Sequence, residues 1–482
     1  MFRILVVILG LALVHSLPMV SAAQAENQFR AGAATSNITP PLGGSIVGGF
    51  LPIPSKHVHD ELHARCLVLD DGETTIALVV CDLLGIHRKI SDEARRLIEE
   101  RVGISPEHVL ISATHTHSAV SAIGDRFEVD QKPNNYQQFV ASRIADGVQR
   151  AHNLLRPAEF GFTTVDVPEH VFNRRWFMKE GTVPLNPFGE IDQVKMNPPG
   201  GSDNLVKPAG PTDPTISILS FREVDGDPIS VMATYSLHYV GGVGSGHISA
   251  DYFGMFCDKL THLLDAAEQD TPFVPIMANG TSGDINNINF TKPRGRKSAY
   301  EQMRYVAHDV AEKVSQALAD VQYKSEITLG AKYREPVIPT RQVSPGKLAW
   351  AQSLLEEPEP ESNRADLPRI YAQRTLNMSK QPKEEPIPIQ AFRIGDVSIG
   401  TMPCEIFCEI GLEYRARTPR KPGFMISLNH GYYGYLPTPK QHALGGYETW
   451  LGTNRLEVDA SVILLDNLIE MTEELAGEKS SE

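Results

Sequence analysis

The segment 66-CLVLDDGETTIALVVCD-82 decides the fold class of this 482-residue chain. Two apolar runs flank Asp71-Gly72, and an Asp-Gly pair between such runs is a strong signal for a β-hairpin. The same pattern predicts a second hairpin around Asp225-Gly226 and a third around Gly395-Asp396. Since a rigid sheet positions the side chains at its strand ends, the residues that follow the three second strands are candidate site residues: Asp82, His238 and Glu405.

The sequence predicts helices between the hairpins and after the last of them. Apolar residues recur at three- and four-residue spacing before Gly103, before Pro157, after Met303 and from Val458 onward. Ser91 is predicted to cap the first of these helices. We therefore expect an α/β fold of mixed α+β layers, with strands in hairpins and flanking helices. The stretches 186–214 and 358–388 read as loops, the second with a helix near Leu367–Met378.

Composition excludes several classes of protein. Hydrophobic residues are 41% and charged residues 22% of the chain, which is ordinary globular usage, so a disordered or fibrous protein is excluded. With 45 Lys+Arg against 59 Asp+Glu, the net charge is −14. Nucleic acid is therefore not an expected partner, because phosphate binding needs clustered cations.

The N-terminus has the pattern of a secretory signal peptide. Met1-Phe2-Arg3 precedes an apolar run that ends near Leu17, and small residues follow as Ser21-Ala22-Ala23-Gln24-Ala25. The run is shorter than the ~20 apolar residues of a membrane span. We expect a signal peptide over residues 1–25, cleaved after Ala23 or Ala25, and a single exported domain over residues 26–482, either secreted or periplasmic. The five cysteines are few and odd in number for an exported chain, so disulfides are not expected to hold the fold.

The strongest local chemical signal is His115-Thr116-His117, directly after the apolar run that ends at Ile111. In an extended chain residues two apart point to the same side, so both imidazoles can face one site, one as metal ligand and one as acid or base. With His238 and Glu405 they provide the two histidines and one carboxylate of a catalytic zinc site. Each signal also has an ordinary structural explanation: a chance His-x-His, a buried histidine, or a carboxylate at a helix N-terminus. Asp82 is expected to accept the second ring N–H of a metal-bound histidine, and Asp284 to stabilise a turn.

These residues resemble the catalytic domain of the neutral, non-lysosomal ceramidase family, from about Ala31 to Tyr447. The resembling motifs are His115-Thr116-His117-Ser118, Phe172-Asn173-Arg174, His238 with Ser249-Ala250-Asp251, Gly283-Asp284 and Pro403-Cys404-Glu405. The most specific motif is Tyr435 before Thr438-Pro439, with Tyr447 twelve residues after Tyr435.

The resemblance implies the chemistry of the site. It makes His115, His238, Glu405 and Tyr435 ligands of one Zn²⁺, and His117, Arg174 and Tyr447 catalytic residues, with Arg174 contacting substrate. It implies hydrolysis of the N-acyl amide bond of ceramide or a related N-acyl lipid. The expected partners are this small lipid-like substrate and, peripherally, a membrane surface, with no obligate protein partner.

Several departures from the family pattern leave alternatives open. Ala119-Val120 follows the His-Thr-His-Ser motif where the family has a Gly/Pro-rich turn, and Tyr239-Val240 follows His238 where the family is more polar. The chain is expected to lack the C-terminal immunoglobulin-like domain of described members. The alternatives are a zinc hydrolase of another amide or ester, and a secreted binding protein without catalysis. A serine amidase built on Ser282 is disfavoured, since Thr281-Ser282-Gly283 is no nucleophile elbow.

Overall fold

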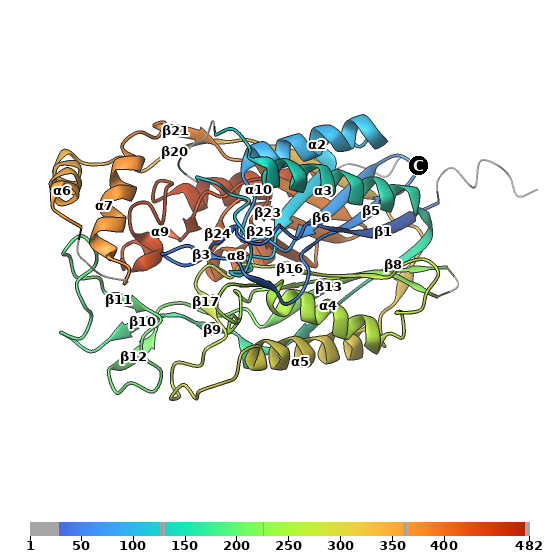
Figure 1. The fold of residues 1–482 in the computed structure, drawn as a ribbon. Helices are drawn as coiled ribbons and strands as arrows, with labels where there is room; N and C mark the ends of the chain where they lie inside the picture. The colour runs from blue at the N-terminus through green and yellow to red at the C-terminus, as the bar shows by residue number, and fades with distance from the viewer. Residues whose placement is uncertain (1–27, 126, 128–130, 225, 360–363, 478–482) are drawn as a thin grey trace, which may run out of the picture.

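A computed structural model of the chain describes residues 28–125, 127, 131–224, 226–359 and 364–477 (Figure 1). The predicted signal peptide lies outside these residues. Among the helices of the described part, none is both long enough and apolar enough to cross a bilayer.

Helices lie between the hairpins along the chain, as the sequence predicts. The strands are β1 (Arg30–Asn37), β2 (Ser45–Ile46), β3 (Ile53–Pro54), β4 (His57–Val58), β5 (His63–Asp70), β6 (Thr75–Cys81), β7 (Val109–Ala113), β8 (Arg156–Asp166), β9 (Phe172–Asn173), β10 (Arg175–Met178), β11 (Val194–Met196), β12 (Leu205–Pro208), β13 (Thr215–Glu223), β14 (Pro228–Tyr235), β15 (His247–Ile248), β16 (Val274–Asn279), β17 (Ile285–Asn286), β18 (Tyr323–Lys324), β19 (Leu329–Arg334), β20 (Val337–Pro339), β21 (Glu384–Pro386), β22 (Ile389–Ile394), β23 (Val397–Met402), β24 (Glu405–Ile406), β25 (Gly423–Ser427) and β26 (Tyr435–Leu436). The helices are α2 (Arg88–Val102), α3 (Asn135–Asn153), α4 (Asp251–Leu263), α5 (Glu301–Leu318), α6 (Pro345–Glu356), α7 (Leu367–Met378), α8 (Cys408–Arg417), α9 (Pro439–His442) and α10 (Ala460–Gly477), with short 3₁₀ turns at η1 (Pro106–His108), η2 (Pro168–His170) and η3 (Tyr447–Thr449).

Two sheets form the centre of the molecule. The larger has nine strands in the order β16-β14-β13-β8-β1-β5-β6-β7, with β18 beside β8, and the smaller has the order β19-β22-β23-β25. All three predicted hairpins are confirmed as antiparallel pairs: β5 with β6, β13 with β14, and β22 with β23. Each hairpin then continues into a parallel neighbour, respectively β7, β16 and β25.

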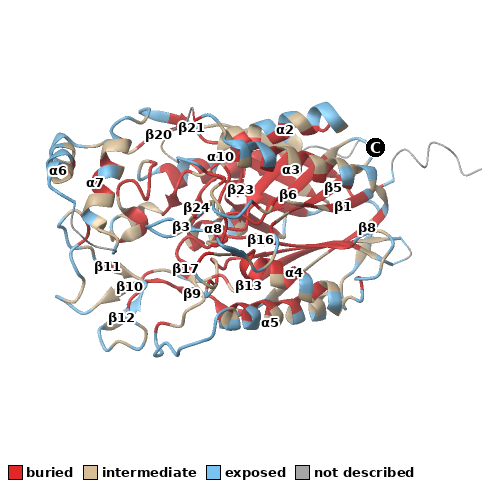
Figure 2. Cartoon of the chain, viewed as in Figure 1, coloured by how far each residue is buried: buried red, intermediate tan, exposed pale blue. Residues whose placement is uncertain are grey.

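The sheets and helices stack in four layers. Alternate residues of each strand point to opposite faces, and Leu67 and Leu78 of the larger sheet pack against Phe392 and Ile399 of the smaller one. The opposite face of the larger sheet is covered by α2 and α3 at one end and by α4 and α5 at the other (Figure 1). The outer face of the smaller sheet is covered by α8 and α10. Figure 2 shows that buried residues concentrate in the strands between these layers, so the predicted class of mixed α+β layers is confirmed.

Two details of the predicted helices are wrong. Ser91 lies inside α2, whose N-cap is His87, and its hydroxyl lies 2.8 Å from Nδ1 of the buried His430. Ser91 therefore makes a tertiary hydrogen bond and does not cap the helix. Val458 and Val462 are exposed, because α10 begins at Ala460 and buries the face that carries Leu464 and Leu468. The five cysteines are all buried and free.

Hydrogen bonds within the larger sheet and between the two sheets position the site. The Asn279 side chain at the end of β16 donates to the Thr114 carbonyl, 3.0 Å away, just after β7. The Ser427 hydroxyl at the end of β25 donates to the Gly280 carbonyl, at 2.7 Å. The segments that follow β7 and β16 and the end of β25 are thus held together at one edge of the double sheet.

Candidate metal centre

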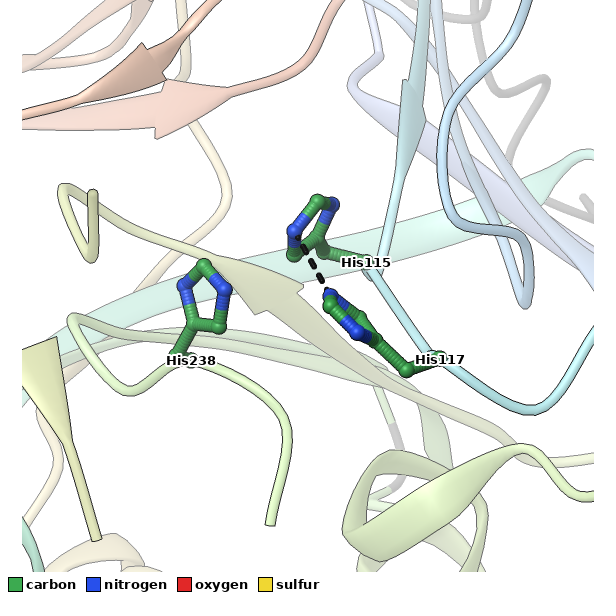
Figure 3. A group of neighbouring side chains, drawn as sticks. All are labelled: His115, His117 and His238. Carbon is green, nitrogen blue, oxygen red and sulfur yellow. Dashed lines mark hydrogen bonds between the residues drawn. The ribbon is translucent and has the colours of Figure 1, made fainter. Parts of the chain in front are cut away.

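Three chain segments that are far apart in sequence meet at this edge. His115 follows β7, His238 follows β14, and Glu405 lies in β24 after β23. The Nε2 atom of His115 lies 3.3 Å from Oε2 of Glu405, and Nε2 of His238 lies 3.7 Å from the same oxygen. Figure 3 shows the two imidazoles turned toward one another, together with His117. The structure therefore brings together the three residues that the sequence nominated as metal ligands.

The backbone sets which ring nitrogen of each histidine faces the centre. Nδ1 of His115 lies 2.7 Å from the Leu84 carbonyl, and Nδ1 of His238 lies 3.1 Å from the Ser282 carbonyl. A carbonyl only accepts hydrogen bonds, so both Nδ1 atoms carry the proton and both Nε2 atoms keep a free lone pair. This is the tautomer that a metal ligand needs, with a partner atom fixing the ring orientation.

Two of these inward-facing atoms have no hydrogen-bond partner among the described residues: Nε2 of His238 and Oε2 of Glu405. Both residues are buried, and a buried polar atom without a partner carries a desolvation cost. A divalent cation between these nitrogen and oxygen atoms would remove that cost. The donor set of two imidazoles and one carboxylate suits zinc, so the residues present fit the group that the sequence predicts.

The electrostatics of the site keep the ligands in their binding forms. Burial alone would raise the pKa of Glu405, but the neighbouring His115 and hydrogen bonds from two tyrosine hydroxyls outweigh burial and lower it to about 2. Burial and the positive charge of Arg174 hold the pKa of His238 well below its usual value. A carboxylate at Glu405 and a neutral imidazole at His238 are the protonation states that bind metal.

Two tyrosines flank Glu405. Tyr435 lies beside Glu405 because β24 and β26 pair in parallel with these two residues in register. The hydroxyl of Tyr432 donates to Oε1 of Glu405 at 2.5 Å, leaving Oε2 directed at the centre. Tyr435 is therefore a direct neighbour of Glu405, and Tyr432 orients the carboxylate.

A buried ion-pair network holds Tyr435. Arg174 donates to the Tyr435 hydroxyl oxygen at 2.9 Å and to Glu448 at 2.9 Å, and the other Glu448 oxygen accepts from Arg175 at 2.7 Å. These three charged residues are at most 3% exposed, and removing one partner of such a network is costly. Arg174 does not line the cavity described below. Its observed contacts make it a residue that positions Tyr435, while a direct contact with substrate stays a prediction.

His117 lies beside the ligand cluster. Its Nε2 is 3.1 Å from Nε2 of His115, and the three histidines have ligand atoms within 4.8 Å of one another (Figure 3). The His115 backbone is in the left-handed region, with φ at 72°, so the prediction of an extended His-x-His was wrong in its geometry. The left-handed turn, rather than strand alternation, brings the two rings to one side.

Two neighbours clamp the His117 ring. The Tyr239 ring stacks on it, with 3.6 Å between ring centroids and 15° between planes. Gly48 also lies against the ring: its φ is 118°, and a Cβ atom there would lie 2.6 Å from the imidazole. A side chain at position 48 would therefore displace the ring. Tyr239 and Gly48 together restrict the orientation of the His117 imidazole.

Replacing Tyr239 with leucine tests this clamp. We expect kcat to fall about 10- to 100-fold, because a misplaced acid/base group loses alignment with the reacting atoms, while metal content stays at the wild-type value. Tyr239→Phe keeps the stacked ring and serves as the matched control, with most activity retained. Equal activity in the leucine and phenylalanine variants, measured on the same substrate, would show that the stacked ring does not position His117.

An open cavity of about 440 Å³ gives access to the cluster. Its polar wall contains His115, His117, Glu405, Tyr432, Tyr435 and Tyr447. Its apolar wall includes Val47 and Phe50 from the β2–β3 hairpin, and α7 contributes Arg374 and Asn377. The Tyr447 ring lies 5.7 Å from that of Tyr435 and 6.0 Å from that of Phe50. Tyr447 is thus placed between the cluster and the apolar entrance.

Two other sequence-predicted residues have structural partners instead. Asp82 pairs with the Arg65 guanidinium and accepts from the His63 backbone, so its predicted contact with a metal-bound histidine was wrong. Backbone carbonyls of neighbouring segments take that role: Leu84, which follows β6, accepts from His115, and Ser282, which follows β16, accepts from His238. Asp284 is buried and accepts from Asn173 and from the Cys408 backbone, which joins three segments. Burial raises the pKa of Asp284 to about 6.

Sequence reasoning missed Tyr432, Tyr239 and Glu448. No local signal distinguishes Tyr432 from its neighbour Tyr433, which packs into the core under α10. Glu448 directly follows Tyr447, and its buried carboxylate has no sequence signature either. Only Tyr239 had a usable signal, its position directly after His238.

The comparisons with known proteins identify a family and a shared fold. The family described as "Neutral/alkaline non-lysosomal ceramidase, N-terminal" matches residues 29–299. The crystal structure of neutral ceramidase from Pseudomonas aeruginosa shares the fold, with a TM-score of 0.71, 17% identity, and coverage of 94% of this chain and 75% of that chain. A structure described as ceramidase complexed with C2 has a TM-score of 0.69 at 16% identity, covering 94% of this chain and 77% of the other.

At these identities the two structures establish the fold alone, whereas the family match extends over more than half of the chain and includes His115, His117, Arg174 and His238. The resemblance noted in the sequence is confirmed: this protein belongs to the neutral/alkaline non-lysosomal ceramidase family.

Proposed function

We propose that the protein is a zinc-dependent hydrolase that cleaves the N-acyl amide bond of ceramide or a related N-acyl lipid. The observation that carries the proposal is the pair of buried, unpartnered atoms, Nε2 of His238 and Oε2 of Glu405, that lie 3.7 Å apart beside His115, with Glu405 and His115 lining the cavity. Membership of the ceramidase family supports the choice of bond and of metal. We also propose that the chain acts after export, as one catalytic domain.

The ligands of one Zn²⁺ would be His115, His238, Glu405 and Tyr435. When bound, zinc lowers the pKa of a coordinated water from ~16 to ~7, which supplies hydroxide at neutral pH. The net reaction adds water across the C–N bond and yields a fatty acid and a free amine.

The chain's own residues then act on the amide. The Tyr447 hydroxyl is placed to donate a hydrogen bond to the amide oxygen as negative charge develops on it. His117 Nε2 takes a proton from water and returns one to the leaving nitrogen. Burial and the neighbouring His115 hold the pKa of His117 well below its usual value, so the ring starts neutral and can accept that proton. Phe50 and Val47 line the apolar entrance, where acyl carbons are shielded from water.

An assay of the purified protein with and without a zinc chelator tests the proposal. We expect hydrolysis of N-lauroylsphingosine, its loss with 1,10-phenanthroline, and its recovery on adding zinc, with about one zinc bound per chain. The non-chelating 1,7-isomer is the matched control. Cleavage of a simple ester but not of the amide would favour another hydrolase, and a metal-free protein without activity that zinc does not restore would favour a binding protein.

A further inference from the structure

A strongly basic loop lies on the other side of Tyr239 from the metal cluster. Between β17 and α5 the chain reads 291-TKPRGRKSAY-300 and places four cations in six positions, all of them exposed: Lys292, Arg294, Arg296 and Lys297. The chain as a whole carries a net charge of −14. A cluster of four cations is therefore unexpected in a chain with this excess of acidic residues, and it needs a physical explanation.

These cations have no carboxylate partner. Among the described residues, no Asp or Glu oxygen lies within 4.0 Å of their charged nitrogen atoms, and Lys297 instead bonds to Gln302 and lies 5.8 Å from the Tyr305 ring centroid. Cations on the neighbouring helices differ. Lys259 pairs with Glu312 at 3.3 Å, and Lys313 pairs with Glu169 at 3.1 Å and Asp309 at 3.2 Å. The loop thus holds mutually repelling charges that the protein leaves uncompensated.

The loop closes two adjoining hollows of about 400 and 470 Å³, which we call the basic hollow. They share part of their walls, including Gly241, Gly242, Asn287 and Arg294. Three cations, five side-chain amides and a serine hydroxyl line them, and no Asp or Glu of the described residues does. In a chain with more acidic than basic residues, a hollow lined by hydrogen-bond donors and free of carboxylates is complementary to an anion.

We propose that the basic hollow binds a phosphate-class oxyanion. Lysine and arginine donate charge-assisted hydrogen bonds to phosphate oxygens, and Lys292, Arg294 and Lys297 all line the basic hollow. The oxyanion can come from a phospholipid head group or from free phosphate, and both present the same oxygen atoms to the loop. A nucleic acid is disfavoured, because the chain outside the loop would repel a long polyanion.

The site is distinct from the metal cluster. The Tyr239 ring contributes to the wall of the basic hollow and stacks with its face on His117. None of the four cations lines the cavity that contains Tyr447 and Glu405. Anion binding can therefore be measured apart from catalysis, and the proposal does not depend on the bond that the enzyme cleaves.

A charge-removal variant tests the proposal on the full-length protein. Lys292→Ser, Arg294→Ser and Lys297→Ser are combined, and the control combines Lys324→Ser, Lys380→Ser and Lys383→Ser, which removes as many exposed cations elsewhere. Inorganic phosphate is titrated by calorimetry, and sedimentation is measured with phosphatidylcholine vesicles that contain or lack phosphatidylglycerol. Circular dichroism and hydrolysis of a short-chain soluble substrate should be unchanged in both variants.

We expect wild type and control to bind phosphate, and the loop variant to bind it at least about tenfold more weakly, the change for losing one charge-assisted hydrogen bond. If wild type and control sediment with anionic vesicles and the loop variant does not, the ligand is a lipid head group. If the proteins bind phosphate but do not sediment with vesicles, the ligand is free phosphate. Two results overturn the proposal: no phosphate or vesicle binding by wild type, or equal losses in loop and control variants. Tighter, loop-dependent binding of an oligonucleotide would also overturn it.

Discussion

His115→Ala is expected to lower N-acyl amide hydrolysis by at least about 10³-fold and to release the metal. Replacing a residue that only hydrogen-bonds to a metal ligand already costs about 10- to 100-fold in metal affinity or activity, and loss of a ligand itself should cost more. His115 is one of the two imidazole ligands of the proposed zinc site, and its Nε2 lies 3.3 Å from Oε2 of Glu405, closer than Nε2 of His238 at 3.7 Å. Without it the buried carboxylate loses the neighbour that most strongly lowers its pKa. Kinetics and metal analysis on the same preparation measure both effects.

The matched control for this variant is His152→Ala, a histidine in the last turn of α3 and outside the cavity. It should keep wild-type activity and zinc content. Retention of stoichiometric zinc and near-normal turnover by the His115 variant would exclude the cluster as the catalytic metal centre. Comparison of the metal-free wild type with the variant by thermal denaturation separates ligand loss from misfolding, because both should unfold at similar temperatures.

Tyr447→Phe is expected to reduce kcat about 10²- to 10³-fold, the usual cost of losing one donor to a developing oxyanion. Phenylalanine keeps the ring, so the contacts with Phe50, Tyr435 and Trp450 remain. The lost hydrogen bond strengthens only as the amide oxygen gains charge, and therefore KM should change little. Zinc content should equal that of the wild type.

Steady-state kinetics on a single N-acyl amide check this result, and Tyr305→Phe, an exposed tyrosine on α5, provides the control. Undiminished kcat in Tyr447→Phe would remove Tyr447 from the reaction. A loss of zinc together with activity would instead assign it a role in holding the metal site.

The site shows which of its features can be predicted from residue patterns and which cannot. His115, His238 and Glu405 were nominated because imidazoles and carboxylates follow apolar strands, and the structure brings their side chains within 4 Å. The contacts behind them were not predicted. Asp82 had been expected to orient a histidine, yet the Leu84 and Ser282 carbonyls do so. Backbone acceptors have no sequence signature, so only coordinates can identify them.

Arg174 shows the same limit for a residue that the family resemblance places at the site. Its motif indicates a place beside the reaction, but the motif says nothing about what the guanidinium contacts. The structure gives it Tyr435 and Glu448, and both lie more than 250 positions further along the chain. Pairing between buried charges depends on which loops meet, and that is decided by the packing of two sheets.

By itself, the sequence determined the three hairpins, the helices between them, the mixed α+β class and the residues able to bind a metal. These properties follow from local rules: apolar periodicity sets strand or helix, and Asp-Gly pairs set turns. Only the tertiary structure decided that the ends of β7, β14 and β23 meet, that a left-handed turn at His115 gathers two imidazoles, and that Tyr432, Tyr239 and Glu448 support them. The physical reason is that long-range contacts depend on burial shared between layers, which no single stretch of chain encodes.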